Sequence, residues 1–174
     1  MKAEKITVMA GILVIILLGF LIVWNAGIIG VSKSRLEQDA RENQKISGDW
    51  KMVQAVDENI CAMLFYDEAK KDCTYSVYLA HEGISYGYFF HDGGVDSYMT
   101  EGTRVVIYDD KGIALLSLNK DRVCRIEVEK NADTQVIQVD PTLPFAVVLP
   151  VGCGEIVMYD VQGNIVTLYD TFRG

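Results

Sequence analysis

Residues 6–31 contain no charged side chain, and this run constrains the chain more than any other feature. An α-helix rises ~1.5 Å per residue, so about 20 apolar residues cross the ~30 Å hydrocarbon core of a bilayer. The run therefore predicts one membrane-spanning helix over residues 6–31, after an N-terminal tail over residues 1–5. The run is longer than the apolar part of a cleaved signal peptide, and no small-residue cleavage site comes after it, which favours an uncleaved signal anchor.

The next segment, residues 32–48, is rich in good helix formers and ends in Ser47 and Gly48. It has few apolar side chains, so we expect a solvated, polar helical stalk that continues the membrane helix. Within the apolar run, Ala26 and Gly30 are small residues four apart. Such a pair allows close contact between membrane helices, so weak self-association is a further expectation.

Charge divides the chain into two unlike parts. The formal net charge is −8 at pH 7. Residues 1–45 carry six Lys and Arg and four Asp and Glu. Residues 46–174 carry the remaining ten Lys and Arg and twenty Asp and Glu, a net charge of −10. A part this acidic argues against nucleic acid as a partner, because phosphates demand a cationic surface. It is also repelled by anionic lipid headgroups, so we expect it to stand off the bilayer.

The side of the membrane is harder to predict, because Lys and Arg are nearly balanced on the two sides of the apolar run. A short tail ahead of one apolar helix is typical of a signal anchor that exports the rest of the chain. We therefore expect a single-pass protein of the cell membrane whose β domain is extracytoplasmic, with a cytoplasmic domain as the alternative.

After Gly48, short apolar runs alternate with turn residues at intervals of roughly 8–12 residues, which is typical of all-β domains. Two Asp-to-Gly turns, over residues 109–112 and 160–163, mark hairpins. The sequence predicts a mainly β fold, with one antiparallel β domain over residues 49–174 that is a sandwich or a strongly curved sheet. The expected strands cover residues 51–56, 60–66, 74–80, 84–90, 103–108, 113–118, 122–128, 134–139, 145–149, 155–159 and 164–169.

Four cysteines, Cys61, Cys73, Cys124 and Cys153, leave the redox state open. Outside the cell an even number can form disulfides, and four cysteines allow three pairings. No two of them have the C-x-x-C spacing of zinc and redox sites. Buried thiols that act as small apolar side chains are the alternative.

An aromatic surface is the main candidate binding site. Alternation along a strand over residues 84–90 places Tyr86, Tyr88 and Phe90 on one face, and Tyr75 of the preceding strand completes the set. Such rings bind a peptide or a sugar by stacking, because Tyr combines an apolar body with a polar tip. Packing across strands within the core is the competing interpretation.

A second candidate joins Cys73 and His91, which adjacent hairpins would bring together as a thiol nucleophile and its base. No other catalytic pattern occurs: phosphate-binding glycine loops, nucleophile elbows and H-E-x-x-H are all absent from the sequence. We therefore expect no cofactor and no metal site.

These observations favour a membrane-anchored, non-enzymatic β domain, attached to the lipid bilayer through residues 6–31, that contacts another protein or belongs to the cell envelope. Two alternatives remain. An apolar helix that leads into a polar helix and a β domain is also the outline of pilin-like assembly subunits. A hydrolase with a site around Cys73 and His91 is the other.

Overall fold

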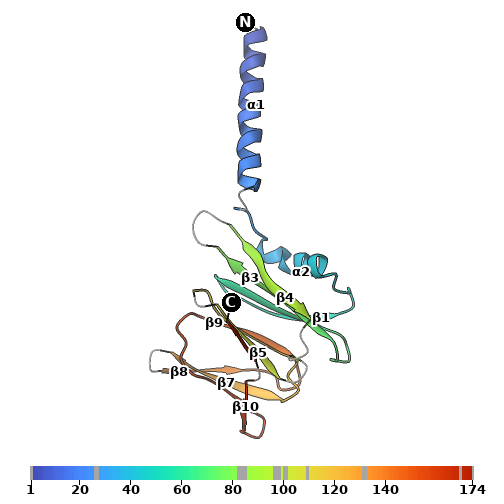
Figure 1. The fold of residues 1–174 in the computed structure, drawn as a ribbon, viewed down its shortest axis with the longest axis vertical. Helices are drawn as coiled ribbons and strands as arrows, with labels where there is room; N and C mark the ends of the chain where they lie inside the picture. The colour runs from blue at the N-terminus through green and yellow to red at the C-terminus, as the bar shows by residue number, and fades with distance from the viewer. Residues whose placement is uncertain are drawn as a thin grey trace.

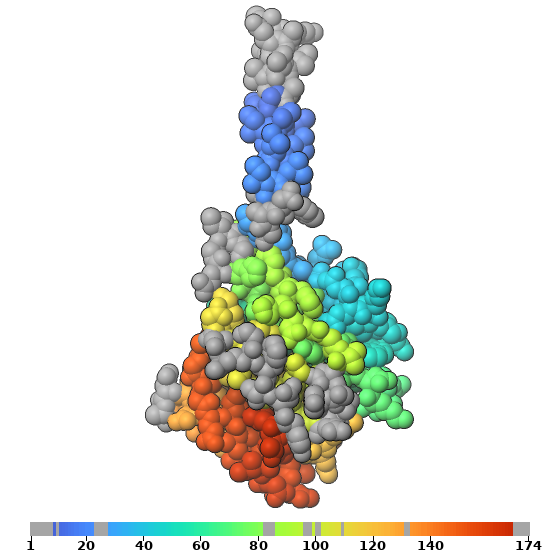
Figure 2. Space-filling view, viewed as in Figure 1, coloured from blue at the N-terminus to red at the C-terminus, as the bar shows by residue number. Residues whose placement is uncertain are grey.

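The computed structural model describes residues 2–25, 28–81, 86–95, 99, 102–108, 110–130, 133–168 and 170–173. A long N-terminal helix projects from a body of β-sheets, as the ribbon and the space-filling view both show (Figures 1 and 2). Over these residues the protein is mainly β, the sheets are antiparallel but for one strand pair, and the helices of the body are short.

The first helix, α1 (Lys2–Asn25), is 24 residues long. Its described side chains are those of Met9 and residues 11–22, and every large apolar side chain among them is at least 53% exposed. Within the described residues, no helix combines the length and the apolar character that crossing a membrane requires. The membrane-spanning helix predicted over residues 6–31 is therefore not supported by the described structure.

An extended strap, residues 28–31, connects α1 to the β-rich part. Gly30 and Val31 donate their backbone N–H groups to the carbonyl oxygens of Tyr86 and Tyr88, both at 2.7 Å, and two further bonds run the opposite way. The chain is thus extended and paired at the point where the sequence predicted the end of a membrane helix.

Two glycines allow the strap to approach so closely. A Cβ added at Gly30 would lie 2.6 Å from the carbonyl oxygen of Tyr88, and one at Gly87 would lie 2.7 Å from that of Val31. Gly87 also has a φ of +90°, which other residues rarely adopt. Gly30 therefore belongs to the strap and not to a helix, and the predicted helix contact through Ala26 and Gly30 is wrong at Gly30; Ala26 lies outside the described residues.

A 3-10 turn, η1 (Lys33–Arg35), leads into the short helix α2 (Leu36–Gln44). Leu36 and Ala40 are four residues apart, so they share one face of α2, and both are fully buried. They pack in a cluster with side chains of the first sheet that includes Cys61, Met63, Phe65 and Tyr78. The solvated stalk predicted over residues 32–48 is therefore wrong, because one apolar pair at helical spacing buries this helix.

The strands form three four-stranded sheets. The first has the order β1-β2-β3-β4 and is antiparallel throughout. The second has the order β12-β5-β6-β9, in which only β12 and β5 are parallel. The third has the order β11-β10-β7-β8 and is antiparallel. The bounds are Lys51–Val56 (β1), Ile60–Tyr66 (β2), Cys73–Ala80 (β3), Tyr88–Val95 (β4), Thr103–Tyr108 (β5), Gly112–Ser117 (β6), Val123–Lys130 (β7), Asp133–Gln138 (β8), Phe145–Leu149 (β9), Ile156–Asp160 (β10), Ile165–Val166 (β11) and Asp170–Arg173 (β12).

The sheets stack face to face, with the second sheet in the middle and α2 across the outer face of the first (Figure 1). Strand β6 shows the arrangement. Ala114 and Leu116 pack towards the first sheet, whereas Ile113 and Leu115 pack towards the third. Because both faces of the second sheet are covered, its strands β6 and β9 are apolar runs without polar alternation.

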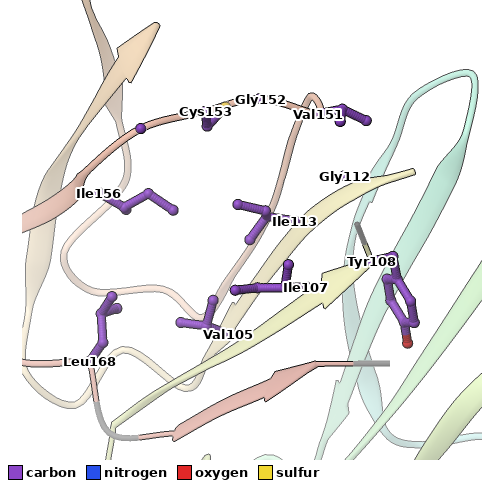
Figure 3. Close-up of a pocket in the computed structure, with 11 residues that line it drawn as sticks. Val105, Ile107, Tyr108, Gly112, Ile113, Val151, Gly152, Cys153, Ile156 and Leu168 are labelled. Carbon is purple, nitrogen blue, oxygen red and sulfur yellow. The ribbon is translucent and has the colours of Figure 1, made fainter. Parts of the chain in front are cut away.

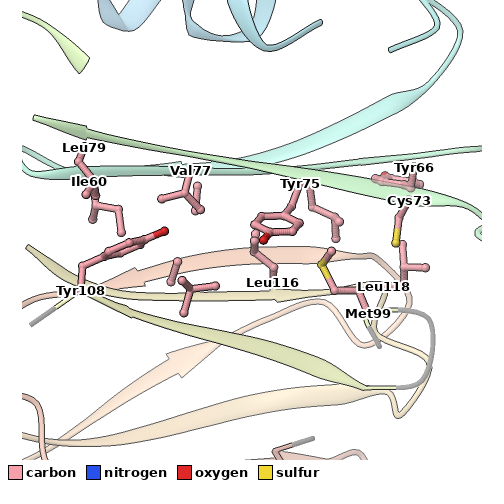
Figure 4. Packing of buried hydrophobic residues seen from close by; sticks show 14 residues of the cluster. Ile60, Tyr66, Cys73, Tyr75, Val77, Leu79, Met99, Tyr108, Leu116 and Leu118 are labelled. Carbon is pink, nitrogen blue, oxygen red and sulfur yellow. The ribbon is translucent and has the colours of Figure 1, made fainter. Parts of the chain in front are cut away.

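The core between the first and second sheets is the larger contact (Figure 4). Side chains from β2 and β3 point down onto those of β5 and β6, and Met99, from the connection to β5, fills one end. The buried members are Ile60, Ala62, Leu64, Tyr66, Cys73, Tyr75, Val77, Leu79, Met99, Val106, Tyr108, Ala114, Leu116 and Leu118.

The expected strands mostly coincide with the observed ones, and those over residues 51–56, 60–66, 103–108 and 145–149 have the predicted bounds. Two differ. Strand β4 begins at Tyr88, later than predicted, and residues 82–85 lie outside the described part. Of the last predicted strand, over residues 164–169, the described part contains the two-residue strand β11, and β12 lies beyond it in a different sheet.

Candidate functional site

Strand β4 positions the aromatic residues, and a bulge at His91 sets their directions. Tyr78 of β3 pairs with Phe90, whereas Val77 pairs with Asp92, so His91 is the extra residue. Phe90 therefore shares the α2-facing side of the sheet with Tyr78, and their rings meet edge to face with centroids 5.5 Å apart.

Tyr75 points the other way, into the core between the first and second sheets (Figure 4). It is 5% exposed, and its hydroxyl donates to Asp92 Oδ2 at 2.8 Å. Burial, reinforced by this hydrogen bond, raises the pKa of Tyr75 to about 12. The predicted face of Tyr75, Tyr86, Tyr88 and Phe90 is therefore wrong as a unit, because Tyr75 and Phe90 lie on opposite sides of the sheet.

Tyr75 belongs instead to a polar cluster that joins the first sheet to the second. The guanidinium of Arg104 lies 4.6 Å from the centroid of the Tyr75 ring. The His91 ring meets the Tyr108 ring edge to face at 5.0 Å, and the buried Tyr108 hydroxyl has no hydrogen-bond partner among the described residues. Burial raises the pKa of Tyr108. The cluster is part of the inter-sheet packing.

The other three aromatic residues lie on or beside β4. Tyr88 packs in the α2 cluster and donates its hydroxyl to the carbonyl oxygen of Asp57. Tyr86 lies beside Ile29 of the strap through an isolated β-bridge and is 71% exposed. Phe90 is 46% exposed.

A groove of about 490 Å³ lies between α2, the strap and β4. We name it the α2–β4 groove. Its lining residues are Ile29, Gly30, Val31, Ser32, Arg35, Gln38, Asp39, Glu42, Tyr88, Phe89 and Phe90.

The two walls of the α2–β4 groove differ in chemistry. The β4 wall is aromatic and partly exposed at Phe90. The α2 wall is polar: Gln38 Nε2 donates to Glu42 Oε1 at 2.8 Å, and Asp39 Oδ2 accepts the Tyr78 hydroxyl at 2.6 Å. The lining carries the carboxylates of Asp39 and Glu42 and the guanidinium of Arg35. An aromatic wall beside this net negative charge suits a peptide segment that carries both apolar and basic side chains.

All four cysteines carry thiols in the structure. Cys61 and Cys73 are on the β2–β3 hairpin, but Cys61 faces α2 whereas Cys73 faces the second sheet. They also lie at opposite ends of the ladder, since Cys61 pairs with Tyr78 and Cys73 with Tyr66. A disulfide between these two is excluded by this geometry.

Cys124 and Cys153 are also apart. The Cys124 thiol donates to the carbonyl oxygen of Asp160 at 3.3 Å, near the start of β7. Cys153 precedes Gly154, which donates to the carbonyl oxygen of Glu129 near the other end of that strand. Five residues of strand correspond to about 16 Å, too far for a disulfide. The sequence left disulfides and free thiols as alternatives, and the structure has free thiols.

The predicted pair of Cys73 and His91 is not assembled. In the register, His91 falls beside Val77, four residues or about 13 Å along β3 from Cys73. Burial raises the pKa of Cys73 to about 11, which opposes the thiolate that a nucleophile needs. Among the described residues, no three His, Cys, Asp or Glu side chains form a group that could hold a metal ion.

A second pocket, of about 330 Å³, lies between the second and third sheets (Figure 3). Its side chains are mostly aliphatic, including Val105, Ile107, Ile113 and Ile156, and no charged residue is among the described residues that line it. The Cys153 thiol is its most reactive group, and burial raises the pKa of this thiol. The pocket therefore offers apolar volume and little chemistry.

Comparison with known proteins gives no relative: no family model, no curated protein and no solved structure matches the chain. The function must be argued from the residues of the chain itself.

The polar wall of the α2–β4 groove was missed by the sequence analysis. Its signal is nevertheless in the sequence, because Arg35 and Asp39, and likewise Gln38 and Glu42, are four residues apart. Residues four apart are neighbours on a helix surface, so the two pairs lie side by side on one face of the helix. Once Leu36 and Ala40 are buried, that side of α2 borders β4.

Proposed function

We propose that this chain is a membrane-tethered, non-enzymatic module that binds another protein through the α2–β4 groove. The observation that carries the proposal is the groove itself, where the exposed Phe90 ring lies opposite the carboxylates of Asp39 and Glu42. Partly exposed aromatic side chains next to charged groups are typical of protein-binding surfaces.

The tether in this proposal is α1. Its 24 residues exceed the about 20 that span a hydrocarbon core, and its sequence is uncharged from Ile6 onwards. The described side chains, Met9 and residues 11–22, cover a shorter stretch than such a span, and those that are large and apolar are exposed. A bilayer removes this apolar surface from water.

The proposal places the β-rich part on the outer side of the membrane. Residues 46–174 carry a net charge of −10. The cytoplasmic leaflet is the one with a negative surface potential, which repels such a domain. The acidic composition therefore favours the opposite side.

Photo-crosslinking tests the groove. A benzoylphenylalanine is placed at Phe90 or at Glu42 of the full-length chain, in cells of its natural host, and at Val136 as a control. Val136 lies on β8 of the third sheet and is 49% exposed, close to the 46% of Phe90. We expect both groove positions to give one adduct of the same mass, and Val136 to give none.

Two results would contradict the proposal. Adducts of equal yield from all three positions would mean that the contacts are not specific to the groove. No adduct from either groove position, with the chain expressed at its normal level, would mean that the groove is not occupied by a protein.

A further inference from the structure

Two exposed apolar side chains lie side by side where the β-rich part meets α1. Ile29 of the strap is 54% exposed and Tyr86 is 71% exposed, and a β-bridge joins the two residues. We name Ile29 and Tyr86 the juxtamembrane patch. Exposed apolar groups that are contiguous and fixed indicate an interaction surface.

The patch is close to the end of α1. Ile29 is four residues beyond Asn25, the last residue of the helix. Four residues of extended chain span at most about 14 Å, so the patch lies within that distance of the end of α1. Figure 1 shows α1 leaving the body at this end, with the strap directly below the helix.

The patch is held rigidly. The strap pairs with the chain at Tyr86 and Tyr88 through four backbone hydrogen bonds of 2.7–2.9 Å. Gly30 and Gly87 meet there at a separation that leaves no room for a Cβ. The patch therefore keeps one orientation relative to the sheets, whereas a flexible linker would not fix this orientation.

Two cations follow the strap in the sequence, while the carboxylates of Asp57 and Glu58 act on Tyr88 on the other side of the strap. Lys33 and Arg35 of η1 come directly after the strap and are exposed, and the strap itself is uncharged. The nearest described carboxylates on α2, Glu37 and Asp39, come later, on the helix that runs along the sheet. Cations beside an apolar patch match the phosphates of lipid headgroups.

We propose that the juxtamembrane patch sits in the interfacial zone of the bilayer, with Lys33 and Arg35 against lipid phosphates. The β-rich part is then held in one orientation on the membrane, and the α2–β4 groove opens at a fixed height above the lipid. Tyr is suited to this zone because its ring is apolar and its hydroxyl is polar. The inference rests on the proposed tether, because α1 brings the patch to the membrane.

The test uses the full-length chain in vesicles of phosphatidylcholine with a minor fraction of phosphatidylglycerol, with or without bromine on the acyl chains. Bromine quenches nearby tryptophan. The unmodified chain reports through Trp24, near the end of α1, with Trp50 as background. The variants Tyr86→Trp and Val136→Trp each add one emitter, and Val136 is on β8, far from α1 (Figure 1).

We expect brominated lipid to quench the emission added by Tyr86→Trp about twofold, as for an interfacial aromatic residue, and to leave that of Val136→Trp unchanged. Quenching of the unmodified chain without quenching of the added Tyr86→Trp emission overturns the patch and keeps the tether. Absence of quenching in the unmodified chain overturns both the membrane contact of the patch and the proposed tether. Equal quenching of the two variants overturns the fixed orientation.

Discussion

Replacing Leu116 by alanine is expected to lower the free energy of unfolding by about 3 kcal/mol, and replacing its neighbour Leu115 by a similar amount. Both side chains are fully buried, although they point to opposite faces of β6. Leu116 fills the core between the first and second sheets, and Leu115 fills the core between the second and third. Each truncation removes apolar contacts and leaves a cavity.

Chemical denaturation of the full-length chain in detergent measures both values. Ile165→Ala is the matched control, because Ile165 on β11 is 68% exposed, and we expect a change within about 0.5 kcal/mol. In a two-layer sandwich, one of the two leucines would face solvent and its truncation would cost little. A large loss at one position and almost none at the other would therefore contradict the stack of three sheets.

Asn119→Ala is expected to cost at least about 3 kcal/mol, because four backbone hydrogen bonds would be lost together, two of them with the buried Val123. The two N–H groups of the Asn119 amide serve three carbonyl oxygens, those of Val123, Asp140 and Leu143, at 2.9–3.1 Å. Its Oδ1 accepts the N–H of Val123 at 2.7 Å. This side chain thereby ties the connection before β7 to the one before β9.

The backbone of Asn119 adds to this cost. Its φ of 57° is left-handed, a conformation that Asn tolerates better than Ala does. Asn164→Ala is the control, because Asn164 is exposed in the β10–β11 turn, where its amide donates to Asp160. We expect a loss of about 1 kcal/mol or less there. Equal losses for the two variants would contradict the role given to Asn119.

The strands could be predicted because their signal is local. The run from Ile60 to Tyr66 is apolar. Asp57 with its turn precedes it and Asp67 with its turn follows it, so both ends of β2 were visible. The Asp160 turn behaves as predicted: its carboxylate accepts the N–H groups of Gln162 and Asn164, and Gly163 has a φ of +85°. Such turns depend on a few adjacent residues.

The stacking of the sheets is not local, so it could not be predicted. A run such as that of β9 is equally compatible with an edge strand and with a strand covered on both faces. The strands β7 and β10, distant in sequence, pair in the third sheet, whereas β9, which lies between them in the chain, joins the second. Only the fold decides which apolar faces meet.

The candidate site shows the same limit. The aromatic residues at Tyr86, Tyr88 and Phe90 were recognised, but a single bulge at His91 decides which side of the sheet each ring faces. A register shift of one residue exchanges the two faces of a strand. The sequence does not show the bulge, so the alternation of side chains predicted the wrong neighbours for Tyr75. The packing of α2 was underestimated for a different reason: two apolar residues looked too few to bury a helix.

The proposed function requires above all that the β-rich part is held at the outer face of a membrane. A cysteine introduced at Val136 reports its side, because this position on β8 is exposed. Burial raises the pKa of Cys61 to about 12 and that of Cys73 to about 11, so these thiols react slowly with maleimide. The unmodified chain supplies the background from Cys124 and Cys153.

The decisive measurement is therefore labelling of Val136→Cys in intact cells with a membrane-impermeant maleimide, and then separation of membranes from the soluble fraction. The account predicts labelling without permeabilisation, with the labelled chain in the membrane pellet. Labelling only after permeabilisation, or a labelled chain that remains in the soluble fraction, would contradict it.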